Sequence, residues 1–459
     1  MQTGTMTQIE RRAVITLSLI MSLRMIGLFM VLPVFSLYAT QLKGASLTLI
    51  GLAIGIYGLA QALFQIPFGS LSDHFGRKPI IFISLLIFAL GSFIAGMASS
   101  IMLLIVGRTL QGIGASGSTI LAMISDFTRE EERTKSMAIA GISIGLSFML
   151  ALLIGPLLTQ WIAINDLFFL AVLFSFIAML ILFLFVPRPI NEHQHRDTQH
   201  TLKSFYQLLM TPALTKLNSG IFILHAIFTA NFVIIPINLY QNLGFQANQQ
   251  WLLYLPALLI ACVISLYLIR IAERQNQVKR YFLDAIVMLI VAELCLWITS
   301  DNFSLTFTGL SLFFTGFSLL EAFLPSLISR IAPSAHKGTA LGIYSCSQFL
   351  GIFIGGLLGG WLYSQFSFQG VYFFCMIASF IWLAIAYRMQ VPRTLITHVL
   401  SLLPHQQKNW DVIAAKLNRV PGIAEIIFVA EESKAYLKME RHTIQHPDFI
   451  HLKEQLQLE

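Results

Sequence analysis

Five ionisable residues stand inside long apolar runs of the sequence, namely Arg24, Arg108, His225, Glu293 and Glu321. An ionised, unpaired side chain costs at least about 2.5 kcal/mol at the middle of a membrane, so such residues normally face a cavity or a partner. Glu321 is the first candidate to carry a proton, because a carboxyl group in a low dielectric favours its neutral form and can exchange a proton near neutrality. His225 is the second candidate, since imidazole titrates in the physiological range.

Each of these residues also has a purely structural interpretation. Glu321 can be a permanently neutral or paired acid that holds helices together, and His225 can be a hydrogen-bonded packing residue. Glu293 is expected to snorkel or to contact a neighbour. Arg24 and Arg108 are expected either to pair with Glu321 or to attract an anionic substrate.

Further polar residues lie on the apolar segments that would line a central cavity. Together with the phenylalanines, they suit an amphipathic or aromatic ligand. Taken singly, each can equally form a hydrogen bond between helices. These residues are Tyr57, Gln61, Gln65, Gln111, Asn231, Asn238, Tyr344 and Gln348.

Membrane-spanning helices must position these side chains. The 459-residue chain is 56% hydrophobic and 11% charged, whereas about a quarter of the residues of soluble globular chains are charged. Apolar runs of roughly 20 residues can cross about 30 Å of hydrocarbon at 1.5 Å per residue. They predict an all-α membrane protein with twelve transmembrane helices. The predicted spans are residues 13–39, 47–71, 78–98, 100–126, 136–160, 166–187, 213–240, 249–271, 280–300, 303–331, 338–364 and 368–389.

Basic residues indicate the orientation of the chain. With the N-terminus in the cytoplasm, the Lys and Arg clusters fall in alternate loops on the cytoplasmic side, and only Lys43 lies outside. The net charge of +7 therefore reflects topology, and no nucleic-acid partner is expected. The cysteines lie within apolar runs and lack the spacing of a metal site. We predict a multi-pass protein of the cytoplasmic (inner) membrane with both termini in the cytoplasm.

The spans divide into two similar halves. The polar segment 188–212 separates six spans from six, and its three histidines are expected to belong to a solvated loop rather than a metal site. Shifting the chain by 201 positions pairs Gly141 with Gly342 and Gly155 with Gly356, which favours duplicated parallel halves. The predicted parts are a cytoplasmic N-terminus (1–12), an N-terminal six-helix bundle (13–187), a cytoplasmic linker (188–212), a C-terminal six-helix bundle (213–389) and a C-terminal domain (394–459).

The composition changes to that of a small soluble domain after Pro392. Residues 394–402, 423–430 and 435–439 predict strands, whereas 408–419 and the segment from Pro447 predict helices. This order predicts a small α+β ferredoxin-like domain in the cytoplasm. Its strand order resembles that of heavy-metal-associated domains, but the loop 403–407 contains no cysteine, which excludes copper capture by a cysteine pair. A regulatory or partner-binding role and a passive folded tail both remain open.

Charged residues gather at the predicted cytoplasmic ends of neighbouring helices. Acids alternate with bases there, so a network of ion pairs could hold the two halves together and close the inner side. Asp73 is also expected to face the positive end of the helix that begins near Gly338 and Thr339, which is worth about 0.3–1 kcal/mol. Ordinary topology charges are the alternative. The predicted gate network comprises Gly69, Asp73, Gly76, Arg77, Lys78, Asp126, Glu130 and Arg133.

Several motifs resemble those of the major facilitator superfamily. Residues 69–78, Gly-Ser-Leu-Ser-Asp-His-Phe-Gly-Arg-Lys, are similar to the family's signature between helices 2 and 3, with His74 where the family usually has Arg. Residues 108–112 resemble its helix 4 Arg motif. Gly155-Pro156 is similar to the antiporter signature of its drug exporters, although the glycine pair that usually follows is missing. Nearly the whole chain resembles the bacterial YajR-type transporters, a branch with a cytoplasmic ferredoxin-like domain, through residues 24–25, 64–69, 324–329 and 344–351.

The resemblance implies a secondary active transporter that works by proton-coupled alternating access. Efflux (antiport) of a small amphipathic or drug-like solute is expected, with the proton gradient as energy source and no cofactor. A proton-coupled importer of the same fold, or a transporter-like sensor that signals through the C-terminal domain, are the alternatives. We expect a monomer whose partners are the lipid bilayer, protons, a small-molecule substrate and a cytoplasmic partner or ligand of the C-terminal domain. The sequence shows no constellation of nucleophile and base, so an enzyme is not expected.

Overall fold

The structure is a computed structural model that forms two compact units. The first unit comprises residues 1–270 and 279–389, and the second comprises residues 271–278 and 390–459. The described residues are 6–187, 202–298, 301–333, 337–389, 395–401, 410–429, 434–440, 443–444 and 446–458. The histidines of the predicted linker, His193, His195 and His200, lie outside them.

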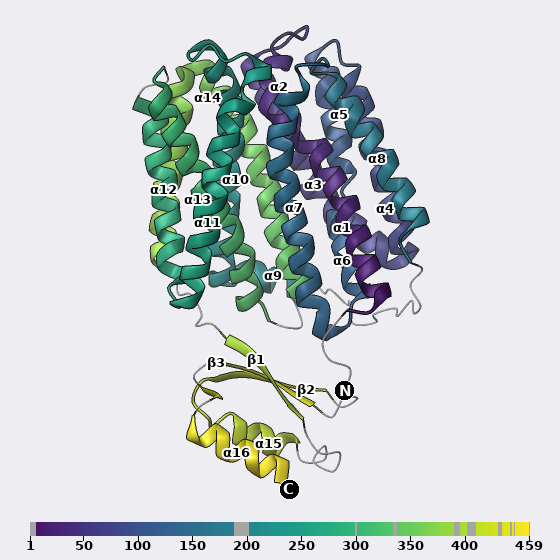
Figure 1. Ribbon diagram of the computed structural model, residues 1–459, viewed down its shortest axis with the longest axis vertical. Coiled ribbons are helices and arrows are strands. Elements are labelled where there is room, and N and C mark those ends of the chain that lie inside the picture. Colours follow the sequence, from purple (N-terminus) through teal and green to yellow (C-terminus); the bar gives the residue numbers. More distant parts are fainter. Residues whose placement is uncertain are drawn as a thin grey trace. The chain divides into compact units, whose positions relative to one another are not determined.

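The first unit is a bundle of long helices that run side by side (Figure 1). Its N-terminal half begins with a capping box, in which the Thr7 and Glu10 side chains each accept from the other residue's backbone N–H. Pro33 stands near the start of the second helix, where a missing N–H costs little. The helices of this half are α1 (Gln8–Phe29), α2 (Leu32–Ala39), α3 (Leu47–Phe75), α4 (Arg77–Gly96), α5 (Ile101–Ile113), α6 (Gly117–Phe127), α7 (Glu130–Leu158) and α8 (Asp166–Leu184).

The predicted continuous helix 100–126 is wrong, because the chain leaves the helical conformation between α5 and α6. Gly114 has ψ of 44° there, so its carbonyl oxygen is released from the helical ladder and accepts from Arg24 Nη2 at 3.1 Å. A Cβ at Gly114 would also stand 2.6 Å from the Ser84 carbonyl oxygen on α4. The break therefore serves close packing and positions a buried cation.

The C-terminal half contains a helix that is much longer than one crossing. α14 extends over 51 residues and bends at Ser367, where φ is 60° and ψ is −162°. The predicted spans 338–364 and 368–389 meet at this bend. Ten helices of the described residues are long and apolar enough to cross a membrane, so twelve crossings stay a prediction. The elements of this half are α9 (Leu202–Met210), α10 (Pro212–Gln241), the 3₁₀ helix η1 (Ala247–Gln249), α11 (Trp251–Arg274), α12 (Val278–Ile298), α13 (Phe303–Ile331) and α14 (Lys337–Tyr387).

Glycines bring α3 of one half against α14 of the other. A Cβ at Gly356 would stand 2.6 Å from the Gly51 carbonyl oxygen, and a Cβ at Gly55 would stand 2.7 Å from that of Phe353. At the end of the bundle that carries the basic loops, which we call the predicted cytoplasmic end, a Cβ at Gly69 or Gly338 would meet no atom within 4 Å. Among the described residues, these glycine contacts between the halves therefore lie toward the opposite end, whereas Gly69 and Gly338 make none at the predicted cytoplasmic end.

The second unit holds a three-stranded antiparallel sheet in the order β1-β3-β2 and two helices (Figure 1). Alternate residues of one strand, Ala435, Leu437 and Met439, are buried in a core with Leu417 and Phe449 of the helices. The predicted α+β class is confirmed, whereas the ferredoxin-like assignment stays a prediction. The elements are β1 (Leu395–Ser401), α15 (Trp410–Leu417), β2 (Ile423–Val429), β3 (Lys434–Glu440) and α16 (Pro447–Leu458).

The contact between α3 and α14 predicts that two glycine-to-alanine substitutions on one helix differ in their effect on stability. Gly356→Ala places a methyl group against the Gly51 backbone, so it should lower the free energy of unfolding by about 1–3 kcal/mol. Gly342→Ala places its methyl group in open space and should not lower the free energy of unfolding, because alanine is a better helix former than glycine. Thermal unfolding of both variants in detergent measures the difference. Equal stabilities would show that α3 and α14 are not in backbone contact.

Candidate functional site

Three polar side chains of the C-terminal half meet inside the bundle. His225 of α10 lies with its Nε2 atom 3.3 Å from Glu321 Oε1 of α13, and 2.8 Å from Gln348 Nε2 of α14. The His225 side chain is 8% exposed and that of Glu321 is 33% exposed. The structure thus brings both predicted proton carriers together, with the carboxyl on the more accessible side.

The geometry of this cluster permits a proton to be shared. Gln348 can donate an amide N–H to the unprotonated Nε2 of the imidazole, while a protonated Nε2 instead donates to Glu321. Each arrangement satisfies a different partner, so a proton gained or lost here changes which helices are linked. The cluster joins α10, α13 and α14, whose mutual positions would respond to that change.

Arg24 belongs to a separate cluster in the N-terminal half. Its Nη2 atom donates to Gln61 Oε1 at 3.2 Å as well as to the Gly114 carbonyl oxygen, and the guanidinium lies 5.5 Å from the Phe88 ring centroid. The Tyr57 hydroxyl donates to the same Gln61 oxygen. Arg24 is 1% exposed. A buried cation is thereby held by neutral acceptors and an aromatic face.

Arg108 on α5 is held in a similar way. Its Nη1 donates to Gln111 Oε1 at 2.7 Å and its Nε to the Ala53 carbonyl oxygen at 3.3 Å. The guanidinium lies 5.5 Å from the Phe35 ring centroid and 5.2 Å from that of Tyr57. The expectation that Arg24 or Arg108 pairs with Glu321 is therefore wrong for this conformation, because amides, carbonyls and rings of their own half hold both cations.

An aromatic cluster connects the halves beside the His225 cluster. The ring centroid of Phe148 on α7 lies 5.5 Å from that of Phe228 and 6.0 Å from that of Phe317. The His225 ring lies 5.7 Å from Phe317. Tyr57 contacts Phe349 of α14 at 6.3 Å. These rings give the shared interior a largely apolar surface interrupted by a few polar groups.

The remaining predicted cavity residues make contacts in several parts of the bundle. Asn231 donates to Glu293 within the C-terminal half, and Asn238 donates to Tyr372 there. Gln65 is 7% exposed on α3, and Tyr344 is 6% exposed on α14. Glu293 is 0% exposed and contacts a neighbouring helix, so it does not snorkel.

Part of the predicted gate network is present inside the N-terminal half. Arg77 pairs with Asp73, and its Nε lies 3.0 Å from Asp126 Oδ2. Lys78 donates to the Val186 carbonyl oxygen at 2.6 Å. Gly76 has φ of 88° at the start of α4, a conformation that favours glycine. These contacts tie α3, α4 and α6 to one another.

The predicted contact of Asp73 with the start of α14 stays a prediction. Asp73 pairs with Arg77, and a Cβ at Gly338 or Gly69 would meet no atom within 4 Å at this end. The Glu130 side chain lies outside the described part of the chain, and Arg133 is half-buried on α7.

Glu10 is a member of this region that the sequence analysis missed. It is 5% exposed, and its carboxylate accepts from Arg129 Nε at 2.9 Å, Arg129 Nη2 at 3.2 Å and the Arg129 backbone N–H at 3.0 Å. The signal was present in the sequence, because Thr7 and Glu10 have the spacing of a capping box. Glu10 thus links the start of α1 to the start of α7.

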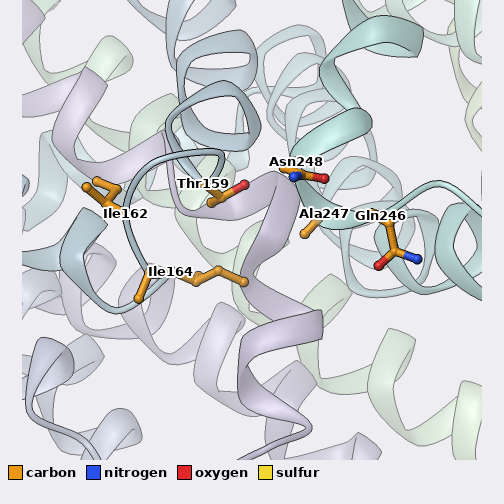
Figure 2. Close-up of a pocket in the computed structure, with 7 residues that line it drawn as sticks. Thr159, Ile162, Ile164, Gln246, Ala247 and Asn248 are labelled. Atoms are coloured by element: carbon orange, nitrogen blue, oxygen red, sulfur yellow. The ribbon is translucent and has the colours of Figure 1, made fainter.

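A pocket of about 290 Å³ opens at the opposite end of the bundle, between the loop after α7 and η1. Figure 2 shows Thr159, Ile162 and Ile164 from the N-terminal half facing Gln246, Ala247 and Asn248 from the C-terminal half. Gln160 Nε2 also donates to the Asn248 carbonyl oxygen at 3.3 Å across the same boundary. The halves therefore touch through their loops as well as through α3 and α14.

The fold and these clusters define a multi-pass membrane protein with polar sites inside two helical halves. The family model described as Major Facilitator Superfamily matches residues 17–347 and 220–405. The chain belongs to this superfamily of transporters.

Comparison with individual proteins agrees with this membership. The chain is similar to the inner membrane transport protein YajR of Escherichia coli (strain K12), with 41% identity over 438 residues that cover 95% of both chains. It is 30% identical over 150 residues to the tetracycline resistance protein, class B, of Escherichia coli, covering 32% of this chain and 37% of that one. The crystal structure of the human organic anion transporter MFSD10 (TETRAN) has a TM-score of 0.64 at 18% identity, covering 83% of this chain and all of that one.

The Glu10 contacts predict a graded loss of stability. Glu10→Gln removes the charge from the hydrogen bonds to Arg129 and should lower the free energy of unfolding by about 1.5–3 kcal/mol. Thr7→Ala removes only the cap and should cost about 1 kcal/mol. Thermal unfolding in detergent ranks the two variants. A Glu10→Gln protein no less stable than Thr7→Ala would contradict the assigned role of the Arg129 contacts.

Proposed function

We propose that this protein is a secondary active transporter that exports a small amphipathic solute in exchange for protons. Two helical halves would expose a shared interior to one compartment and then to the other. The contact of α3 with α14 toward one end, together with open space around Gly69 and Gly338 at the other, supports such an alternation. The assignment as a transporter rather than an enzyme follows the names of its relatives.

The observation that carries proton coupling is the His225, Glu321 and Gln348 cluster. An acid within a membrane span is costly when ionised, so Glu321 is retained in the interior only if its partner or its access to water offsets that cost. Partial exposure gives its carboxyl a path to protons, and the contact with His225 couples its charge to α10. Loading and unloading this pair would shift the balance between the two arrangements of the halves.

The proposed direction is efflux, and the solute is proposed to be amphipathic or aromatic. Relatives named for tetracycline resistance match about a third of this chain, and Gly155 packs its helix against the backbone of Met30, directly after α1. The rings of Phe148, Phe228 and Phe317 form an apolar surface of the kind that holds such solutes.

The proposed location is the cytoplasmic membrane with both termini in the cytoplasm. The match to the inner membrane transport protein YajR covers 95% of both chains. The basic loops gather on the side of the bundle where both termini are predicted. The proton gradient across that membrane would supply the energy, without a cofactor. The C-terminal unit is proposed to bind a cytoplasmic partner or ligand, and the transporter is proposed to work as a monomer.

Glu321→Gln tests the coupling because it keeps the shape of the side chain and removes the titrating group. In proteoliposomes with an imposed pH gradient, this variant should lose gradient-driven movement of tetracycline and of a panel of amphipathic aromatic compounds. It should keep gradient-free exchange of the same compounds. His225→Ala should impair driven movement as well, whereas Asp284→Asn, an exposed acid on α12, serves as the control. Unchanged driven flux in Glu321→Gln would remove this residue from the mechanism.

A further inference from the structure

A second acid is buried in the C-terminal half, apart from the His225 cluster. Glu293 lies on α12 and is 0% exposed. Its Oε1 atom accepts from Asn231 Nδ2 of α10 at 2.6 Å, while Oε2 has no hydrogen-bond partner among the described residues. Glu293 stands five residues before the end of α12 at Ile298, or roughly 7–8 Å along the axis. It therefore lies near the end of the bundle opposite to the predicted cytoplasmic end.

The surroundings of Glu293 contain polar groups but no compensating cation. Tyr372 and Cys375 of α14 lie within electrostatic range of its carboxyl, and Tyr254 of α11 interacts with Tyr372. One turn further along α12, Leu296 packs against Gly309 of α13. No Lys, Arg or His pairs with Glu293 in the described part of the chain.

This environment favours the neutral acid in the conformation observed here. A buried carboxylate with one amide donor and no cation pays a large desolvation cost that a single hydrogen bond does not offset. A protonated carboxyl keeps the Asn231 contact at Oε1 and carries its proton on Oε2. The orphaned oxygen is thus the natural position of an exchangeable proton.

A line of hydrogen bonds connects the neighbourhood of this acid to the surface. Asn242, exposed at the end of α10, donates to Asn238 Oδ1 at 2.6 Å. Asn238 donates in turn to the Tyr372 hydroxyl oxygen at 3.3 Å. Because Tyr372 accepts that bond, its own O–H remains available to donate toward Glu293. Water that enters beside Asn242 would therefore meet polar groups along its way to the acid.

We propose that Glu293, with Asn231 and Tyr372, is a second proton-binding site, filled from and emptied into the compartment opposite to the cytoplasm. Uptake forms the Oε2–H bond with a proton from water on that side, and release returns the proton to the same water when this end opens. Glu321 lies ten residues from the end of α13 at Ile331, about 15 Å along the axis from the predicted cytoplasmic end. The two acids thus serve opposite ends of the C-terminal half.

Infrared difference spectroscopy of the full-length protein as a function of pH tests this site without any substrate. In the Glu321→Gln background, one carbonyl band of a protonated carboxylic acid should remain, should weaken as pH rises, and should be lost on adding Glu293→Gln. Asn231→Ala should shift the frequency of that band, because it removes the amide bond to Oε1. Asp284→Asn, which changes an exposed acid on the same helix, should leave the band unaltered.

The route has its own test, which does not depend on whether Glu293→Gln folds. Tyr372→Phe keeps the ring and removes the hydroxyl, so it should slow hydrogen–deuterium exchange of the Glu293 carboxyl and leave that of Glu321 unchanged. A spectrum without the band would show that Glu293 is ionised, and a band that persists at every pH up to unfolding would show a permanently neutral structural acid. Either result would overturn the proposal while leaving the transport function untouched.

Discussion

Direct backbone contact between α3 and α14 is the constraint on which the rest of the structure depends. Gly51 and Gly55 on one helix meet Gly356 and Phe353 on the other, and no side chain fits between them. The contact of these four residues is made of van der Waals surface, so separating them breaks no charge interaction. A contact of this kind can hold one end of the bundle closed. It can also separate when the helices tilt. The open space around Gly69 and Gly338 shows the complementary arrangement at the other end.

The buried ionisable side chains described above contact partners within their own half. Arg24 and Arg108 bind amides and carbonyls of the N-terminal half, whereas His225, Glu321 and Gln348 bind one another in the C-terminal half. Contacts across the boundary include the glycine contact of α3 with α14, the ring pair of Phe148 and Phe228, and the bond from Gln160 to Asn248. Movement of the halves therefore leaves the costly buried charges with their partners. A change in the charge of Glu321 or Glu293 acts first on the C-terminal half, which holds both acids.

Much of the fold could be predicted from the sequence, because uninterrupted apolar runs and basic loops follow directly from the bilayer. The α+β character of the C-terminal unit could equally be predicted, from the alternation of apolar and polar residues in its strands. The break at Gly114 could not be predicted, since it depends on the approach of α4 and on the Arg24 side chain. The partners of Glu293 and Glu10 were missed for the same reason: contacts between distant helices leave only weak traces in the local sequence. The association of His225 with Glu321 could not be derived either, although each residue was recognised by its cost in a membrane.

Distance measurements between spin labels at both ends of the bundle test the central claim that the halves alternate. In a cysteine-free background, one label pair would replace Phe75 and Gly338 at the predicted cytoplasmic end, and another would replace Trp161 and Tyr240 at the opposite end; all four positions are exposed. On reversal of the pH gradient across proteoliposomes, the account predicts that the first distance shortens while the second lengthens. Two distances that stay fixed, or that change in the same direction under every gradient, would contradict it.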